Sequence, residues 1–323
     1  MIKPLAIIAG EPNSISSEVI FKTWKLKNKY NLKPFFVIGN FDLLNLQRKK
    51  LKFNIPLKKL NKNFRIENIN NKVLCILDMP CSQKKPFEKI SVKSNSYIFD
   101  SFDKAIILIK QKKICGIINC PVSKETLFKK KHQGITEYLS KKTKSNGKEV
   151  MLIYNKNLAV CPITTHIPLN KVSKNINKSI IVKKVLVIDK FYKKFIKKKP
   201  IIGILGINPH NFNFSNKSKK NDVVVLAIKK LIKLKIKVKG PVVADSSFMM
   251  LKKYKFDVIV GMYHDQVLTP FKALYKFDAI NITLGLPFIR VSPDHGTGVN
   301  IIGKNIANPM SLIESIKFFK KIN

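Results

Sequence analysis

Short apolar, strand-like runs recur along this chain, and segments with the period of a helix separate them. The strand-like runs cover residues 5–9, 35–38, 73–77 and 114–118, and the helical segments cover 16–30, 41–50 and 96–112. Strands that alternate with helices in this way predict βα units and a largely parallel sheet with helices on both faces. The first constraint on the fold is therefore an α/β architecture.

The length of the chain limits the number of domains. With 323 residues it can form two α/β domains or one large one, and either is long enough to bury a core. The stretch from about Lys124 to Lys220 is richer in lysine and asparagine than its surroundings, which indicates a second subdomain. We therefore expect two α/β/α subdomains, the first made of residues 1–123 and 260–323 and the second of residues 124–259.

Three of the five histidines each follow a strand-like run. His166 comes after residues 159–164, His210 after residues 201–207, and His264 after residues 258–262. The carboxyl ends of parallel strands face the ligand crevice of an open sheet, so the three imidazoles are expected to converge on one divalent cation. The alternative is that each ring only satisfies loop backbone, because the chain has no HExxH helix or CxxC pair.

The charge of the chain is strongly positive. A formal net charge of +43 and a pI of about 10.1 would suggest nucleic acid or an anionic membrane as partner. The positive residues are almost all lysines spread along the whole chain, and Arg48, Arg65 and Arg290 are the only arginines. Base readout and phosphate recognition favour arginine, so we expect no nucleic acid partner. An AT-rich coding bias explains the excess of lysine, asparagine and isoleucine, although a basic field would also steer a phosphorylated substrate to the protein.

The cysteines and the amino terminus bear on the compartment. Five cysteines show neither paired metal spacing nor a dense disulfide framework, which is typical of a reduced environment. The segment after Met1 is too short and too soon polar for a signal peptide, and no run reaches the roughly 20 apolar residues of a membrane span. These features predict a soluble cytoplasmic protein.

Chemistry-bearing residues are densest between Lys272 and Asn308. Arg290 lies in a segment punctuated by glycine and proline, and a guanidinium offers a planar fork for phosphate or carboxylate. We therefore predict that Arg290 and Lys272 bind an anion, with a surface salt bridge as the alternative for Arg290. The turn His295-Gly296-Thr297-Gly298 allows close approach of the backbone to a ligand, whereas no GxGxxG follows the first strand.

Several of these motifs together resemble one known family. They are Gly10-Glu11-Pro12, Cys120-Pro121-Val122-Ser123-Lys124, Tyr263-His264-Asp265-Gln266, the string from Asn281 to Arg290, and Asp294-His295-Gly296-Thr297. In this order they resemble the 4-hydroxythreonine-4-phosphate dehydrogenase family of pyridoxal phosphate biosynthesis. The resemblance covers nearly the whole chain and implies a fold like that of isocitrate and isopropylmalate dehydrogenases, with the active site in the interdomain cleft at a dimer interface.

The resemblance also implies an activity. Members oxidise the C3 hydroxyl of 4-phosphooxy-L-threonine with NAD or NADP, and the resulting β-keto acid loses carbon dioxide to give 3-amino-2-oxopropyl phosphate. A divalent cation such as zinc, magnesium or cobalt assists, and the protein is a homodimer with a shared active site. By this resemblance the metal ligands are His166, His210 and His264, and the substrate contacts are Thr136, Lys272, Asn281 and Arg290.

The remaining site residues are predicted partly from their chemistry. Lys124, Asp245 and Asp265 are candidates for proton transfer near the cation, although each also fits a turn or a surface charge. The segment with His295, Gly296, Thr297 and Asn300 resembles the nucleotide-binding loop of decarboxylating dehydrogenases. Because Asn300 is an amide where relatives that prefer NAD have a carboxylate, the choice between NAD and NADP stays open.

The chain departs from the family pattern at several positions. Residues 13–18 read Asn-Ser-Ile-Ser-Ser-Glu where the family has Ala-Gly-Ile-Gly-Pro-Glu, so two glycines are lost and a backbone needing positive φ would be strained. Ile135 replaces a substrate-binding histidine, for which His132 is a candidate to compensate. These changes leave two alternatives: a related dehydrogenase for another β-hydroxy acid, and a basic nucleic-acid-binding protein on a retired enzyme scaffold.

Overall fold

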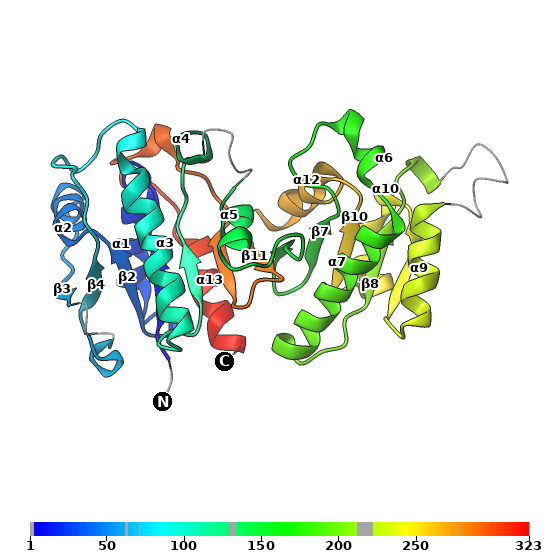
Figure 1. Cartoon of the computed structure of the whole chain (residues 1–323), viewed down its shortest axis with the longest axis horizontal. Helices are drawn as coiled ribbons and strands as arrows, with labels where there is room; N and C mark the ends of the chain where they lie inside the picture. Colours follow the sequence, from blue (N-terminus) through cyan, green and yellow to red (C-terminus); the bar gives the residue numbers. More distant parts are fainter. Residues whose placement is uncertain are drawn as a thin grey trace. The chain divides into compact units, whose positions relative to one another are not determined.

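The computed structural model describes residues 3–61, 64–70, 72–128, 134–211, 222–276 and 278–322. Its contacts divide the chain into two compact units, which we call unit 1 (Met1–Leu139 and Pro287–Asn323) and unit 2 (Ser140–Leu286). Each unit is an α/β structure, which confirms the predicted fold class, and Figure 1 labels many of the elements of both. The boundaries differ from the expected ones, because β10 (Val258–Gly261) and β11 (Ile280–Leu284) pair with strands of unit 2.

The sheet of unit 1 is parallel, and its described strands occur in the order β3-β4-β2-β1-β5-β12. They are β1 (Leu5–Ile8), β2 (Phe35–Gly39), β3 (Leu57–Leu60), β4 (Leu74–Asp78), β5 (Ile117–Asn119) and β12 (Arg290–Pro293). Every residue of β1, β2 and β5 is buried, as expected for the inner strands of a parallel sheet. The apolar runs predicted as strands thus form the centre of this unit.

Helices cover the sheet of unit 1. They are α1 (Ser16–Leu26), α2 (Phe41–Lys50), α3 (Asn95–Lys110), α4 (Lys124–Phe128) and α13 (Met310–Ile322), with short 3-10 turns η1 (Ile66–Asn68), η2 (Val92–Ser94) and η6 (Val299–Ile301). Helix α3 packs against β1 and β2, whereas α13 packs against β12 and α1. The Asn40 side chain accepts a hydrogen bond from the Leu43 backbone N–H, which explains where α2 begins.

The sheet of unit 2 is mixed, with the described strand order β11-β6-β7-β10-β8-β9. The strands not yet given are β6 (Val150–Tyr154), β7 (Ala159–Pro162), β8 (Ile202–Leu205) and β9 (Val238–Val242). Strand β6 is antiparallel to both β11 and β7, and the pairs β7–β10, β10–β8 and β8–β9 are parallel. The parallel part places the carboxyl ends of β7, β10 and β8 next to one another.

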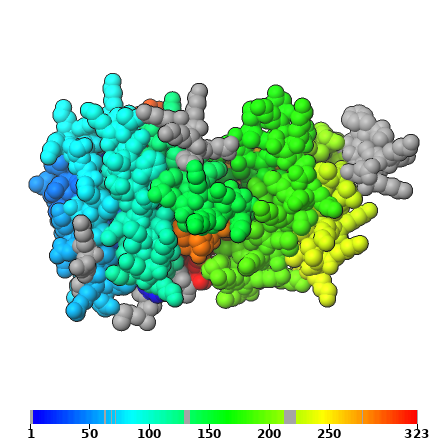
Figure 2. All heavy atoms as spheres, in the orientation of Figure 1, coloured from blue at the N-terminus to red at the C-terminus, as the bar shows by residue number. Residues whose placement is uncertain are grey.

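Unit 2 has its own helices. They are α6 (Val172–Asn175), α7 (Lys178–Phe191), α9 (Val223–Lys233), α10 (Ala244–Ser247), α11 (Leu251–Tyr254) and α12 (His264–Tyr275), with the 3-10 turns η3 (Leu169–Lys171) and η5 (Pro209–Asn211) and the π-helical turn η4 (Tyr192–Ile196). Helix α5 (Ile135–Lys142) begins in unit 1 and ends in unit 2. Helix α12 packs on β7 and β10, and α7 packs on β6, β11 and α9. In Figure 2 the green segment that contains α7 forms part of the visible surface of this unit.

The other findings on the fold concern cysteines and membranes. All five cysteines are free; Cys75, Cys120 and Cys161 are buried, and Cys81 and Cys115 are partly buried. Among the helices of the described ranges, none combines the length and the apolar character that a bilayer crossing requires.

Candidate active site

The three histidines predicted as metal ligands lie at neighbouring strand ends in unit 2. His166 follows β7, His210 follows β8 and His264 is the first residue of α12, directly after β10. Since β10 lies between β7 and β8, the sheet brings the three loops to the same edge. The hydroxyl of Thr164 donates to the Met262 carbonyl at 2.8 Å and so joins the first of these loops to the third.

Two of the three imidazoles are close together. The ring centroids of His166 and His264 are 5.9 Å apart, at an interplanar angle of 43°. The Nδ1 atom of His264 lies 2.7 Å from Oδ1 of Asp265, a carboxylate whose side chain is 78% exposed. Asp265 therefore orients the His264 ring, one of the roles expected of a carboxylate beside a metal ligand.

His210 approaches a different carboxylate. Its backbone is left-handed, with φ at 50°, and its Nδ1 atom lies 4.0 Å from Oδ2 of Asp245. Both side chains are largely exposed, at 77% and 67%. They line a cavity of about 240 Å³ whose other walls are Ile207, Asn208, Pro209, Ala244, Tyr263 and Gln266. Because Tyr263 immediately precedes His264, this cavity joins the loop of His210 to the start of α12.

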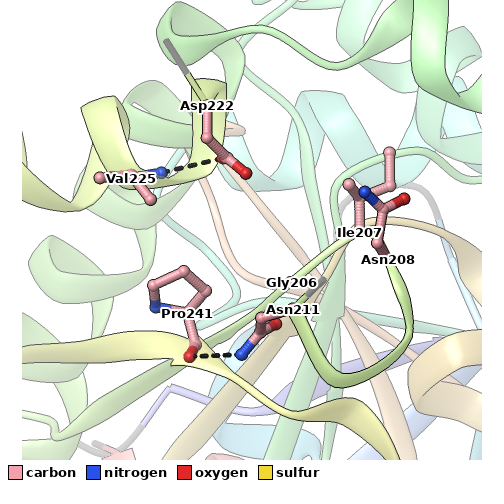
Figure 3. Close-up of a pocket in the computed structure, with 7 residues that line it drawn as sticks. All are labelled: Gly206, Ile207, Asn208, Asn211, Asp222, Val225 and Pro241. Atoms are coloured by element: carbon pink, nitrogen blue, oxygen red, sulfur yellow. Dashed lines mark hydrogen bonds between the residues drawn. The ribbon is translucent and has the colours of Figure 1, made fainter. Parts of the chain in front are cut away.

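A second cavity of about 280 Å³ lies beside the same loop (Figure 3). Its lining residues are Gly206, Ile207, Asn208, Asn211, Asp222, Val225 and Pro241. Nδ2 of Asn211 donates to the Pro241 carbonyl at 2.9 Å, and the Asp222 carboxylate accepts from the Val225 backbone N–H. The Asn211 backbone is also left-handed, with φ at 57°, a conformation that asparagine tolerates better than most residues. Asparagine can therefore adopt the left-handed conformation that this turn requires at position 211.

The imidazole and carboxylate groups at this edge of the sheet are of the kinds that bind a divalent cation. The three imidazole rings are not as close together as the ligands of one bound ion. Imidazole and carboxylate groups are ligands that zinc and cobalt accept. In the part of the chain that the structure describes, no three histidine, cysteine, aspartate or glutamate side chains are grouped so that they hold one ion. The three-histidine metal site therefore stays a prediction, supported by shared strand ends and by one adjacent pair of rings.

Two predicted substrate contacts also belong to unit 2. Lys272 is exposed on α12, and Asn281 lies in β11 opposite Ile153 of β6. The Oδ1 atom of Asn281 is buried, and within the described ranges no donor reaches it. A buried amide oxygen without a donor is costly unless a bound water or ligand satisfies it, so Asn281 retains capacity to bind a ligand.

In unit 1, Arg290 is buried rather than at a surface salt bridge. Arg290 is the first residue of β12 and is 4% exposed. Its Nε donates to Oδ1 of Asn119 at 2.6 Å. Its Nη1 lies 3.5 Å from the Thr136 hydroxyl. Burial lowers the pKa of Arg290 to about 10, although the nearby Glu137 carboxylate acts in the opposite direction. A guanidinium desolvated to this degree favours an anionic ligand.

The substitution of Ile135 has a structural explanation. This side chain is 5% exposed and forms part of the core at the start of α5, one residue before Thr136. It therefore contributes packing and no polar group. His132, the candidate to compensate, lies outside the described residues. Lys124 begins α4 and is exposed; its aliphatic chain passes 3.6 Å from where a Cβ of Gly134 would lie.

The predicted nucleotide segment follows β12. The Thr297 carbonyl accepts a hydrogen bond from the Ile15 backbone N–H at 3.0 Å, and Asn300 is exposed in η6. His295 places Nδ1 3.1 Å from the Gly296 carbonyl, while its Nε2 is buried and meets no partner among the described residues. Burial lowers the pKa of His295, so the neutral ring with an Nε2 acceptor is favoured. Gly296 has no heavy atom within 4 Å of an added Cβ, which leaves open space beside it.

The loss of glycines in the loop after β1 does not strain the backbone. Neither Ser14 nor Ser16 has a positive φ, so the conformation that would have required glycine is absent from this described loop. The Ser14 hydroxyl donates to the Glu11 carbonyl at 2.6 Å and contacts the Ser16 hydroxyl at 2.7 Å. Gly10 is different, because its φ is 74° and an added Cβ would lie 2.4 Å from the Pro121 carbonyl oxygen.

Sequence reasoning missed Asn119, the residue that orients Arg290. It ends β5, is 3% exposed, and its amide donates to the Cys120 carbonyl while its Oδ1 accepts from Arg290. The available signal was an asparagine directly after the apolar run at residues 114–118. Because β5 and β12 are far apart in the sequence, nothing local connected it with Arg290.

Comparisons with known proteins identify the family. The sequence profile described as pyridoxal phosphate biosynthetic protein PdxA matches residues 31–319. The 4-hydroxythreonine-4-phosphate dehydrogenase of Sulfurihydrogenibium sp. is 36% identical, with 98% of this chain and 97% of the relative covered. That of Aquifex aeolicus is 33% identical, with 100% and 99% covered. This chain belongs to the PdxA family.

A solved structure of a PdxA relative agrees with this assignment. The 4-hydroxythreonine-4-phosphate dehydrogenase of Klebsiella pneumoniae has a TM-score of 0.84 at 27% identity, with 99% of each chain covered. Agreement over both whole chains shows that the departures at residues 13–18 and at Ile135 occur inside a conserved PdxA architecture. The chain is accordingly a member of a dehydrogenase family of pyridoxal phosphate biosynthesis, as its motifs predicted.

Proposed function

We propose that this protein is an NAD(P)-dependent 4-hydroxythreonine-4-phosphate dehydrogenase that converts 4-phosphooxy-L-threonine to 3-amino-2-oxopropyl phosphate. The observation that carries the proposal is the buried guanidinium of Arg290, held by Asn119 beside Thr136, in a chain of the PdxA family. The relatives that match the whole chain carry the same enzyme name, which supports the same substrate here.

Several of the proposed substrate contacts suit the anionic groups of the substrate. Arg290 and Thr136 present N–H and hydroxyl groups in unit 1, and Lys272 and Asn281 present an ammonium and an amide in unit 2. Arginine suits phosphate and carboxylate because two of its N–H groups bind two oxygens at once. Asn119 fixes the plane of the guanidinium before substrate arrives, so less ordering is required on binding.

The nucleotide is assigned to the segment after β12, at His295, Gly296, Thr297 and Asn300. The neutral His295 ring offers its buried Nε2 as an acceptor, and the open space at Gly296 admits a ligand close to the backbone. Asn300 carries no charge that would repel a 2′-phosphate, so the proposal covers both NAD and NADP.

We propose that His166, His210 and His264 hold a divalent cation of the zinc, cobalt or magnesium class. When bound, such an ion supplies a positive charge that lowers the pKa of the substrate hydroxyl and stabilises negative charge after carbon dioxide leaves. Asp265 orients the His264 ring, and Asp245 lies on the side of His210. The three rings would bind the ion in their neutral form.

The proposed reaction requires groups that transfer protons. The C3–H bond breaks and its hydride passes to the nicotinamide ring, while the C3 hydroxyl loses its proton to a base. The bond to the carboxylate then breaks, carbon dioxide leaves, and the electron pair forms an enolate that takes up a proton. Asp245, Asp265 and Lys124 are the proposed proton-transfer groups, since each is exposed and free to exchange with water.

The proposal is tested by assaying the purified protein with 4-phosphooxy-L-threonine and each nucleotide, with and without added zinc, cobalt or magnesium. We expect nucleotide reduction together with release of one carbon dioxide per turnover. Absence of reduction with NAD and with NADP under all three metals would contradict the proposal. Reduction without carbon dioxide would retain the dehydrogenase and reject decarboxylation.

One observation favours a second candidate function. Because Ile135 is part of the core, it cannot offer the hydrogen bond that a histidine at this position would give the substrate. A dehydrogenase for another β-hydroxy acid fits this loss. The two candidate functions are separated by comparing kcat/KM for 4-phosphooxy-L-threonine with kcat/KM for unphosphorylated and sugar-acid analogues. The second candidate predicts the higher value for an analogue.

We also propose a cytoplasmic homodimer with a shared active site. The five free cysteines support a reducing compartment. Sedimentation of the purified protein tests the dimer, and restored activity on mixing two inactive variants, one altered at Arg290 and one at His264, tests the shared site. A monomer at micromolar concentration with full activity would contradict this part.

A further inference from the structure

The nucleotide segment after β12 is thinly packed. Of residues 297–308, all of which the structure describes, Ala307 alone is buried, at 2% exposure. Val299 and Ile306 expose 58% and 64% of their surface in spite of their apolar side chains. We call residues 297–307 the strap. A segment with so little buried surface is not fixed by its own packing, so its position depends on what holds its two ends.

The first end of the strap is held by Ile15, in the loop before α1. The Ile15 backbone N–H donates to the Thr297 carbonyl at 3.0 Å. Its side chain covers Gly298, where an added Cβ would lie 2.8 Å from Cγ2 of Ile15. Gly298 also has φ at 60°, so glycine is required there both by the backbone and by this close contact.

The second end is held by Glu18 and Lys22 of α1. Oε1 of Glu18 accepts from the Ala307 backbone N–H at 2.6 Å and from Nζ of Lys22 at 2.8 Å. The same Nζ donates to the carbonyls of Asn305 and Ala307, each at 2.9 Å. One ion pair thus satisfies three backbone groups of the strap, which is a stronger attachment than neutral hydrogen bonds would give.

The burial of Glu18 indicates how much depends on this attachment. Its side chain is 1% exposed, and in the described part of the chain Oε2 has no hydrogen-bond donor. The charge is therefore compensated by Lys22 and Ala307, together with the amino end of α1, where Glu18 lies in the first turn. Burial of a carboxylate costs free energy, so the charge of Glu18 depends on these contacts.

We infer that Glu18 and Lys22 are positioning residues that hold the strap in the conformation that binds the nucleotide. The inference rests on the proposed function, in which His295, Gly296, Thr297 and Asn300 contact NAD(P). If the strap leaves this conformation for part of the time, the apparent Kd rises in inverse proportion to the fraction of molecules that keep it. The affinity for the phosphorylated substrate, which relies on Arg290, does not depend on the ion pair.

The test compares Glu18→Gln, Lys22→Met and a matched control, Asp189→Asn. Asp189 on α7 is 5% exposed, forms an (i, i+4) ion pair with Lys193 at 2.6 Å, and has a buried Oδ1 without a partner in the described residues. It resembles Glu18 in each respect but does not contact the strap. Binding is measured by the fluorescence of NADH and NADPH, with amide hydrogen exchange over residues 299–308 on the unliganded protein.

For Glu18→Gln and Lys22→Met we expect the Kd for the nucleotide to rise about tenfold. The KM for the phosphorylated substrate should stay within about twofold, and exchange at the end of the strap near Ala307 should become faster. Asp189→Asn should lower thermal stability without either effect. Lys22→Met keeps the test valid if the buried Glu18→Gln substitution prevents folding, because the Lys22 side chain is 22% exposed.

Nucleotide affinities of both variants within about twofold of wild type would overturn the inference. An equal loss in Asp189→Asn would also overturn it, because the effect would then be general destabilisation. In both cases the wild type still binds NAD(P) and the proposed function stands. A wild type that binds neither nucleotide rejects the cofactor assignment itself, and is distinguished by the absence of binding before any substitution.

Discussion

Arg290 donates from Nε to Oδ1 of Asn119 across 2.6 Å, although 171 positions separate the two residues in the chain. The contact joins the first residue of β12 to the last residue of β5. These two strands are neighbours in the parallel sheet of unit 1. The contact orients the guanidinium so that Nη1 faces the Thr136 hydroxyl. Two neutral groups thus lie at Nε and Nη1 of the buried guanidinium, and the Glu137 carboxylate also acts on it.

Arg290→Lys is expected to raise the KM for the phosphorylated substrate at least tenfold. Lysine keeps the charge but loses the planar fork, and a hydrogen bond to a charged group contributes about 1.5–3 kcal/mol. Steady-state kinetics measure the change. Arg48→Lys is the control, because Arg48 lies on α2 and its guanidinium donates to Asn45 and to the Phe53 carbonyl, which are not among the proposed substrate contacts. Equal kinetics of Arg290→Lys and wild type would show that the anion binds elsewhere.

His264→Ala is expected to abolish stoichiometric zinc or cobalt binding, and His166→Ala to do the same. The two rings are neighbours, so removal of one deprives an ion of an adjacent ligand. Elemental analysis of dialysed protein gives the metal content per chain. His295→Ala should retain the metal, since His295 belongs to the nucleotide segment. Unchanged metal content in both ligand variants would reject the site.

Glu11→Gln is expected to raise the free energy of unfolding at pH 7 by about 1 kcal/mol. Glu11 is 1% exposed, and burial raises its pKa above 4.5, although hydrogen bonds from Asn13 and Ser94 act in the opposite direction. The folded state therefore holds the Glu11 proton more tightly than the unfolded chain does. The free energy of unfolding of the protein falls as pH rises from 4.5 through the raised pKa of Glu11. Glutamine avoids that loss and can still accept from the Asn13 backbone N–H.

Urea unfolding at pH 4, 5.5 and 7 measures this difference between Glu11→Gln and wild type. The difference in free energy of unfolding between Glu11→Gln and wild type should be smallest at pH 4, where both folded proteins carry a neutral group at position 11. Glu125→Gln, an exposed carboxylate on α4, should show no such dependence. A gap that does not change with pH would mean that ionisation of Glu11 does not contribute.

Cys120 and Cys161 are expected to resist thiol reagents in the native protein at pH 8. Burial raises the pKa of Cys120 to about 12 and that of Cys161 to about 11, and both side chains are inaccessible. Thiolate is the reactive form, so these residues should be labelled only after denaturation. Peptide mass mapping after brief labelling distinguishes them from the partly exposed Cys81 and Cys115. Rapid native labelling of Cys120 would contradict its burial.

Local patterns in the sequence were sufficient for most individual elements. The apolar run at residues 258–262 forms β10, and the run at 5–9 forms β1. Their apolar spacing is a property of the chain itself, because strands and helices bury side chains with different periods. The subdomain boundaries lie elsewhere than expected, because the partners of β10 and β11 depend on distant pairing.

The sequence by itself determined the α/β class, the positions of His166, His210 and His264 after strands, and the motifs that identify the PdxA family. The tertiary structure alone decided that Asn119 orients Arg290, that Ile135 belongs to the core, and that Glu18 and Lys22 hold the segment ending at Ala307. The physical reason is that periodicity and turn chemistry act between near neighbours in the chain. Hydrogen bonds between residues more than a hundred positions apart depend on strand order and burial, which only the folded chain sets.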